Sequence, residues 1–300
     1  MQSKTTIGLD NAFRPKDSSR CLVARGAREL ESIGIENARL DAEIMLAAAS
    51  NSSRGAVISG LAQVDEVIRE RYLAMIAQRR HRAPLAYILG HKEFYSLELE
   101  VTPAVLIPRP ETETVVSTAL EFIQSCPEAS VWDVGTGSGA IALAIAANAP
   151  GARVTATDIS ASALAVARRN TTRLELDGRV RFRLADCCDP ADRMEPLGRF
   201  DLIVSNPPYI RDAEIAGLDA EISCYEPRIA LSGGHDGLGL YRRLARVLPD
   251  HLEKSGSAVV EIGAGQLTAV CEIMRNAGAV SIKVVRDLAG TPRVVIADFR

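Results

Sequence analysis

The stretch Val131-Trp132-Asp133-Val134-Gly135-Thr136-Gly137-Ser138-Gly139-Ala140 decides the fold of this 300-residue chain. It begins as an apolar strand and runs into a turn with three glycines, and the apolar residues 141–146 after it predict a helix. Glycines let the main chain turn sharply and let a ligand approach it closely. The stretch therefore predicts a strand, a turn and a helix, with a ligand held at the turn.

An acidic residue follows the next predicted strand, 153–157. This residue is Asp158, which stands nineteen positions beyond Gly139. A carboxylate in that place can accept hydrogen bonds from both hydroxyls of a ribose, although it could instead cap the following helix. The turn and Asp158 together predict a site for a cofactor that contains a nucleoside.

The glycines alone leave two kinds of cofactor open. Gly135, Gly137 and Ala140 fit the dinucleotide pattern G-x-G-x-x-G/A, and they also fit the E/D-x-G-x-G turn of S-adenosylmethionine enzymes. Asp133 favours S-adenosylmethionine, because its carboxylate can neutralise the amino group of that cofactor but would repel a pyrophosphate. A nicotinamide dehydrogenase would also need a residue that relays a proton, and no His or Lys stands at a predicted strand end.

The tetrapeptide Asn206-Pro207-Pro208-Tyr209 follows another apolar strand, 201–205. The side chain of Asn206 offers a carbonyl acceptor, and proline lacks an N–H, so carbonyl oxygens at this strand end are free to accept from a ligand. Two neighbouring acceptors suit one planar –NH2 group, and Tyr209 offers a flat face for a planar substrate. The tetrapeptide therefore predicts a site for an amide or an aryl amine.

The turn and the tetrapeptide together predict a methyltransferase that acts on such a nitrogen. We expect Asn206, Pro207 and Tyr209 to be catalytic, with 206–209 holding the substrate and Asn206 also contacting the cofactor. An exocyclic amine of adenine or guanine in nucleic acid is an alternative substrate, but such enzymes usually carry a basic surface, and this chain has a net charge of −3. A non-catalytic binding module would have no need of Asn206.

The composition argues against several other classes of protein. Aromatic residues make up 4% of the chain, which leaves few platforms for stacking on bases. None of the six cysteines forms a C-x-x-C pair and the four histidines are scattered, so we expect reduced thiols, no metal site and no disulfide framework. No stretch has the length and apolarity of a secretory signal or a membrane span. We expect a cytoplasmic monomer that contacts neither a membrane nor, directly, a nucleic acid.

The spacing of apolar residues divides the chain into four expected parts. These are a flexible tail (1–19), a helical bundle (20–82), a connector that contains a β-hairpin (83–110) and a catalytic domain (111–300). In the bundle, Gly34 is expected to end the first helix, and further helices are expected at 38–49 and 64–80. The hairpin is expected from Phe94 and Tyr95 and from the alternation of Leu97, Leu99 and Val101.

Strands and helices alternate in the catalytic domain, which predicts a doubly wound α/β sheet of seven strands. The strands are expected near 131–134, 153–157, 179–184, 200–205, 257–262, 280–285 and 293–298. The helices are expected near 138–148, 161–172, 237–253 and 265–276. The last two strands leave no room for a crossover helix, so they should pair antiparallel. Ligands bind beyond the carboxyl ends of parallel strands, where we expect Gly135, Asp158, Asp186, Cys187 and Asn206.

Four motifs resemble the HemK/PrmC family of protein-(glutamine-N5) methyltransferases, which modify peptide chain release factors. The motifs are Arg82-Ala83-Pro84-Leu85-Ala86-Tyr87-Ile88-Leu89-Gly90, Val105-Leu106-Ile107-Pro108-Arg109-Pro110-Glu111-Thr112-Glu113, Ser205-Asn206-Pro207-Pro208-Tyr209-Ile210 and Glu226-Pro227-Arg228-Ile229-Ala230-Leu231. The resemblance covers about 20–300, and the run 107–113 resembles the release-factor branch more than the sister branch that modifies a ribosomal protein glutamine.

The resemblance implies a class I, Rossmann-like S-adenosylmethionine-dependent sheet and a role for each site residue. It implies that S-adenosylmethionine is lined by Gly135, Thr136, Gly137, Ser138 and Gly139. It implies that Asp158 binds the ribose and that Asp186 and Cys187 flank the adenine. Residues 206–209 would hold the glutamine of a Gly-Gly-Gln loop, and the small N-terminal helical domain would help to dock the release factor.

Overall fold

The computed structural model describes residues 18–186, 198–287 and 289–299, which form two compact units that divide after Leu89. The expected tail lies outside the described residues except for Ser18 and Ser19, and the structure differs there. Helix α1 already begins at Ser19, because the side chain of Ser18 accepts from the main-chain N–H of Cys21 and so caps the helix.

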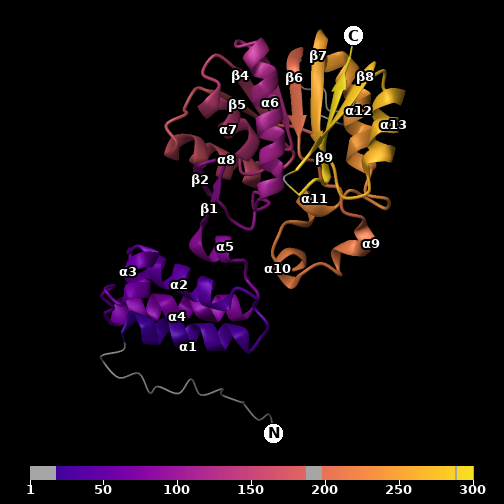
Figure 1. The fold of residues 1–300 in the computed structure, drawn as a ribbon. Helices are drawn as coiled ribbons and strands as arrows, with labels where there is room; N and C mark the ends of the chain where they lie inside the picture. The colour runs from indigo at the N-terminus through magenta and orange to yellow at the C-terminus, as the bar shows by residue number, and fades with distance from the viewer. Residues whose placement is uncertain (1–17, 187–197, 288, 300) are drawn as a thin grey trace. The chain divides into compact units, whose positions relative to one another are not determined.

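The first unit is helical, as expected from its apolar spacing. Its helices are α1 (Ser19–Glu31), α2 (Ala38–Ala49), α3 (Arg54–Ser59), α4 (Glu66–Arg80) and α5 (Leu85–Leu89) (Figure 1). The largest side chains of its core are Tyr72, Leu22, Leu30, Met45, Leu46 and Ile76. Helix α3 was not predicted, because six residues with Val57 as the single buried side chain are too short to show a period.

The second unit contains a seven-stranded sheet with the order β5-β4-β3-β6-β7-β9-β8. The strands are β3 (Ser130–Val134), β4 (Arg153–Asp158), β5 (Val180–Leu184), β6 (Phe200–Ser205), β7 (Leu252–Glu261), β8 (Ser281–Arg286) and β9 (Pro292–Asp298). The first five strands in this order are parallel, and β9 pairs antiparallel with both β7 and β8. The doubly wound sheet and its antiparallel closing pair are therefore confirmed.

Helices cover both faces of this sheet (Figure 1). One face carries α6 (Glu113–Ser125), α7 (Ala140–Asn148) and α8 (Ala161–Arg173), and the other carries α12 (Gly239–His251) and α13 (Leu267–Asn276). Alternate residues of a strand serve the two cores: Val131 packs on the first face, whereas Trp132 packs on the second. Because both faces are buried at the centre of the sheet, the central strands β3 and β6 are mostly apolar.

The remaining elements are short. The hairpin pairs β1 (His91–Phe94) with β2 (Leu97–Glu100), so the structure divides the expected connector and assigns this hairpin to the second unit. A 3-10 turn, η1 (Pro110–Thr112), precedes α6, and three short helices follow β6: α9 (Asp212–Ile215), α10 (Ala220–Ser223) and α11 (Arg228–Leu231). Within the described residues, no helix is both long and apolar enough to cross a membrane.

Candidate active site

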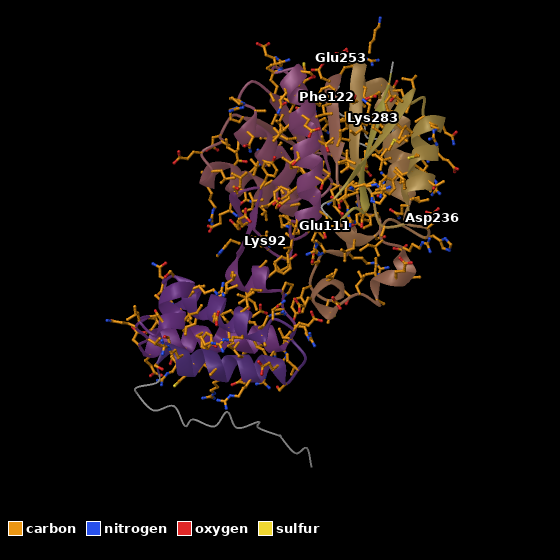
Figure 2. The ribbon with its side chains drawn as sticks, in the orientation of Figure 1. Lys92, Glu111, Phe122, Asp236, Glu253 and Lys283 are labelled. Carbon is orange, nitrogen blue, oxygen red and sulfur yellow. The ribbon has the colours of Figure 1, made fainter. Side chains whose placement is uncertain are left out.

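Four neighbouring parallel strands end at one edge of the sheet, and each brings a residue of the site to that edge. In sheet order, Asp158 ends β4, Gly135 follows β3, Asn206 follows β6 and Glu261 ends β7. A cavity of about 420 Å³ lies along this edge, and its wall includes the first three of these residues. Figure 2 shows Glu111 and Asp236 toward the same end of the sheet, away from Glu253 near the start of β7.

The glycine-rich turn lines the cavity with Gly135, Thr136, Gly137 and Ser138. Gly135 and Gly137 have φ angles of +75° and +57°, and a Cβ atom on either would project into open space. The turn therefore leaves a cradle that side chains would fill. Gly139 differs from them, because it is buried and a Cβ there would lie 2.9 Å from Leu143 Cδ1. Gly139 therefore allows the turn to pack closely against α7 and does not line the cavity.

Asp133 lies fully buried beneath this turn, outside the residues that line the cavity. Its Oδ2 accepts a hydrogen bond of 2.6 Å from the hydroxyl of Thr136, which braces the turn. Its Oδ1 is buried and accepts no hydrogen bond from the described residues. Burial raises the pKa of Asp133 to about 7, against the lowering effect of the Thr136 hydroxyl. Oδ1 is thus an orphaned acceptor that a cationic ligand group would satisfy.

Asp158 lines the cavity at the end of β4. Its Oδ2 accepts from the N–H of Gly137 at 2.8 Å, and its Oδ1 accepts from the N–H of Ser160 at 2.9 Å. Burial raises the pKa of this carboxyl, and these two main-chain donors oppose the rise. Ser160, rather than Asp158, caps α8 through its side chain. Each carboxylate oxygen of Asp158 keeps a further lone pair for a ligand hydroxyl.

The cavity wall also includes Asp186, which follows β5 beside the end of β4 and forms an ion pair with Arg243 of α12. One guanidinium nitrogen, Nη2, lies 2.7 and 2.6 Å from the two carboxylate oxygens. Arg243 also lines the cavity, and it was not predicted from sequence because it stands on the polar side of an ordinary amphipathic helix. Cys187, the other predicted neighbour of the adenine, lies outside the described residues.

The tetrapeptide 206–209 begins directly after β6. Asn206 and Pro208 line the cavity, whereas Pro207 is buried. Among the described residues, no donor bonds to the main-chain oxygens of Asn206 and Pro207, so both retain their capacity to accept hydrogen bonds. The main-chain oxygen of Tyr209 accepts 3.0 Å from the side chain of Gln266, which thereby holds the end of the tetrapeptide. Burial raises the pKa of the Tyr209 hydroxyl.

A buried polar chain continues from Asn206 to two residues that sequence reasoning missed. Asn206 Nδ2 donates to the hydroxyl of Thr112 at 2.9 Å, and that hydroxyl donates to Glu261 Oε2 at 2.6 Å. Thr112 stood inside the motif 105–113 without an assigned role. Glu261 could have been found from sequence, because it is a carboxylate at the end of the predicted strand 257–262.

Arg109 and Glu226, which belong to two of the quoted motifs, form an ion pair beside the cavity. The other oxygen of Glu226 accepts from the N–H of Ile107 at 3.3 Å. Burial raises the pKa of Glu226, and the Arg109 guanidinium opposes the rise.

Comparison with known proteins identifies the family. The family model described as "PrmC N-terminal domain" matches residues 22–90, and the family model described as "Methyltransferase small domain" matches residues 116–221. The release factor glutamine methyltransferase of Koribacter versatilis is 40% identical over 272 residues, which cover 90% of this chain and 94% of the relative. That of Moorella thermoacetica is also 40% identical, over 93% of this chain and 97% of the relative.

The chain belongs to the release factor glutamine methyltransferase family.

Two solved structures are similar to this chain. A human methyltransferase 10 domain containing protein superposes with a TM-score of 0.50 at 17% identity, over 68% of this chain and 90% of the other, which shows the shared fold alone. The release factor-specific protein-(glutamine-N5) methyltransferase of Alicyclobacillus acidocaldarius is 32% identical over 67% of this chain and 99% of its own, with a TM-score of 0.40.

The release factor glutamine methyltransferase fold implies S-adenosylmethionine as the cofactor, and the residues at the edge of the sheet fit it. The cradle at Gly135 and Gly137 admits the close approach of a ligand, and Asp158 has lone pairs for ribose hydroxyls. Asp133 was predicted to meet the positive amino group of this cofactor; it is fully buried and outside the cavity wall, so that contact stays a prediction. Within the described residues, no group of acidic, His or Cys side chains could hold a metal ion.

Proposed function

We propose that this chain methylates the side-chain amide nitrogen of the glutamine in the Gly-Gly-Gln motif of peptide chain release factors. The names of the relatives support this substrate. The observation on the chain itself that carries the proposal is the pair of acceptors at the end of β6. These are the side-chain oxygen of Asn206 and the main-chain oxygen of Pro207, which accepts no hydrogen bond from the described residues.

The chemistry of an amide explains why such acceptors are needed. An amide nitrogen is a poor nucleophile, because its lone pair is delocalised into the carbonyl group. Asn206 and Pro207 would each accept one of its hydrogens, which raises the electron density on nitrogen and fixes its direction at a reacting distance of roughly 3–3.5 Å. Tyr209 would lie against the planar amide. S-adenosylmethionine supplies the methyl group when it is bound.

The proposed site needs no dedicated general base. The nitrogen loses its proton after methyl transfer, when the product is a much stronger acid than the substrate amide. The roles proposed for the other residues follow from their positions at or near the cavity wall. Asp158 would hold the ribose, and residues 135–138 would line the cofactor. Asp133 would accept a hydrogen bond from the amino group of the cofactor, and Asp186 would lie beside the adenine.

The proposal extends to the partner and the compartment. The helical unit 18–89 would dock the release factor, because it is too large for a linker and the cavity residues belong to the other unit. The enzyme would act as a monomer. The enzyme would act in the cytoplasm, where a release factor is made and used.

Tandem mass spectrometry of a release factor incubated with enzyme and S-adenosylmethionine tests this function. We expect one methyl group on the glutamine of Gly-Gly-Gln. The variant Asn206→Ala should lower kcat by roughly 10²–10³-fold, as for the loss of one fixed polar partner at a reacting centre. It should leave the affinity for S-adenosylhomocysteine nearly intact in calorimetry. An unmodified release factor, together with a methylated adenine or guanine in an offered oligonucleotide, would overturn the proposal.

A further inference from the structure

The hydroxyl of Thr112 lies between two polar side chains from distant parts of the second unit. It is 2.6 Å from Oε2 of Glu261 at the end of β7 and 2.9 Å from Nδ2 of Asn206 after β6. Thr112 is 4% exposed and Glu261 is 1% exposed, so water cannot readily replace either partner. The three side chains therefore form a buried chain that ends at the proposed substrate nitrogen.

The direction of the hydrogen bonds in this chain follows from the chemistry of the groups. An ionised carboxylate only accepts, and a hydroxyl has a single hydrogen to donate. The hydrogen of Thr112 therefore goes to Glu261, and the hydroxyl can only accept from Asn206. Asn206 must turn its –NH2 group toward Thr112, which leaves its carbonyl oxygen for the substrate.

The opposite orientation of Asn206 would disable the proposed site. The two ends of a carboxamide have nearly the same size and shape, so sterics alone do not choose between them. An Asn206 turned by 180° would present –NH2 to the –NH2 of a glutamine, where neither group accepts. It would also present a donor to the carboxylate of a glutamate, which only accepts.

We propose that Thr112 and Glu261 are positioning residues that lock the amide of Asn206 with its oxygen toward the substrate, and that this lock selects glutamine over glutamate. The inference rests on the proposed function, because it concerns the same substrate nitrogen. It adds two residues that act on the substrate through Asn206: Thr112, which lies on the cavity wall, and Glu261, which lies behind it.

The lock requires the ionised form of Glu261. Burial raises the pKa of Glu261 to about 7, while the Thr112 hydroxyl lowers it. A protonated Glu261 can donate to Thr112, which frees the threonine hydrogen to donate to a reversed Asn206. The other ionisable groups around Glu261 are Arg293 on β9, Arg109 and Glu111 before α6, Tyr209, and Tyr241 on α12. We therefore expect kcat to rise with pH through the region near 7.

Thr112→Val tests the lock, because it removes the hydroxyl and keeps a side chain of similar shape. The matched control is Thr118→Val in α6, which removes another buried hydroxyl that bonds at 2.7 Å to its own helix at Thr114 O. Thr112→Ser retains a hydroxyl and serves as the rescue. The measurements are kcat and KM on a Gly-Gly-Gln peptide, inhibition by a Gly-Gly-Glu peptide, and affinity for S-adenosylhomocysteine.

We expect Thr112→Val to lower kcat by roughly 10–10²-fold, less than the loss of Asn206 itself. The preference for the glutamine over the glutamate peptide should fall by about 10-fold, as for a misplaced hydrogen-bond partner. Cofactor affinity should stay the same, Thr112→Ser should recover most of the loss, and Thr118→Val should match the wild type. Wild-type kcat and wild-type peptide preference in folded Thr112→Val would overturn the inference.

Glu261→Gln gives an independent measurement that does not depend on the Thr112 variant. Its side chain cannot ionise, so the rise of kcat near pH 7 should disappear. A rise that persists unchanged in Glu261→Gln would show that another group titrates, and the lock would be wrong. Failure of the proposed function is a separate outcome, since the wild-type enzyme itself would then leave the Gly-Gly-Gln peptide unmodified.

Discussion

The guanidinium of Arg109 pairs with the carboxylate of Glu226, a side chain that stands 117 positions further along the chain and is 1% exposed. Glu226 also accepts from the N–H of Ile107. The pair therefore joins the segment that leads into α6 to the loop between β6 and α11. Both segments line the cavity.

Loss of Arg109 should destabilise the protein. Arg109→Met leaves the buried carboxylate of Glu226 without its counter-ion, which typically costs about 3–5 kcal/mol. The double variant Arg109→Met, Glu226→Gln should cost less than Arg109→Met alone, because no charge is then left unpaired. Urea unfolding of the wild type, both single variants and the double variant measures this coupling. Arg242→Met is the control: it breaks an exposed pair with Asp236, and it should not measurably change stability.

Loss of Asp158 should weaken cofactor binding and leave binding of the peptide substrate unchanged. Asp158→Ala removes two charge-assisted hydrogen bonds to the ribose, on the order of 2–4 kcal/mol together. It also frees the N–H groups of Gly137 and Ser160, so circular dichroism must first show a native fold. Calorimetry with S-adenosylhomocysteine measures the loss of affinity. An affinity equal to that of the wild type would show that Asp158 does not bind the ribose.

The buried carboxyl of Asp133 should make the stability of the protein depend on pH. Its pKa is about 7 in the folded chain against an ordinary 3.8, so the folded protein holds a proton that the unfolded chain has released. The free energy of unfolding should therefore fall as pH rises from about 4 to about 7, and this contribution should level off above that range. Asp133→Asn should show a shallower fall and a higher Tm than the wild type at pH 8.

Thermal unfolding between pH 4.5 and 8 without cofactor measures this dependence. Glu261 has a raised pKa of about 7 and adds a fall of the same sign, so the slope should shrink in Asp133→Asn but not vanish. Equal slopes in the wild type and Asp133→Asn would mean that Asp133 does not carry the proton.

Removal of the helical unit should separate docking from chemistry. A chain that begins at Gly90 keeps every residue of the cavity and should still bind S-adenosylhomocysteine. It should lose much of its kcat/KM on a folded release factor and comparatively little on a Gly-Gly-Gln peptide, because only the full substrate can use a remote docking surface. Equal losses on both substrates would make the helical unit a stabilising element instead.

The sequence predicted this fold well because its strongest signals are local. A strand such as 131–134, its glycine turn and the apolar helix after it follow one another directly within 131–148, and the period of apolar residues identifies the strand and the helix. The absence of space for a crossover helix between the last two strands sufficed to predict their antiparallel pairing. Short elements such as α3 and α9 were missed, because a few residues cannot show a period.

The site was predictable only in part, for a related reason. Gly135, Asp158 and Asn206 each follow a strand directly, so the rule for parallel sheets brings them together. The contact of Thr112 with Glu261 joins residues 149 positions apart, and no local pattern announces it. The same holds for Arg243, which pairs with Asp186 across 57 positions.

The position of β9 has a consequence for how this protein is made. The last strand of the chain, Pro292–Asp298, lies inside the sheet between β7 and β8. Until those residues emerge from the ribosome, β7 and β8 each expose an unpaired edge, and such edges invite pairing with other chains. The strand that ends in Glu261 thus gains its second neighbour only after β9 has been made. A chain that lacked β9 would carry the whole glycine-rich turn and Asn-Pro-Pro-Tyr, yet its unpaired strand edges would make it prone to aggregation.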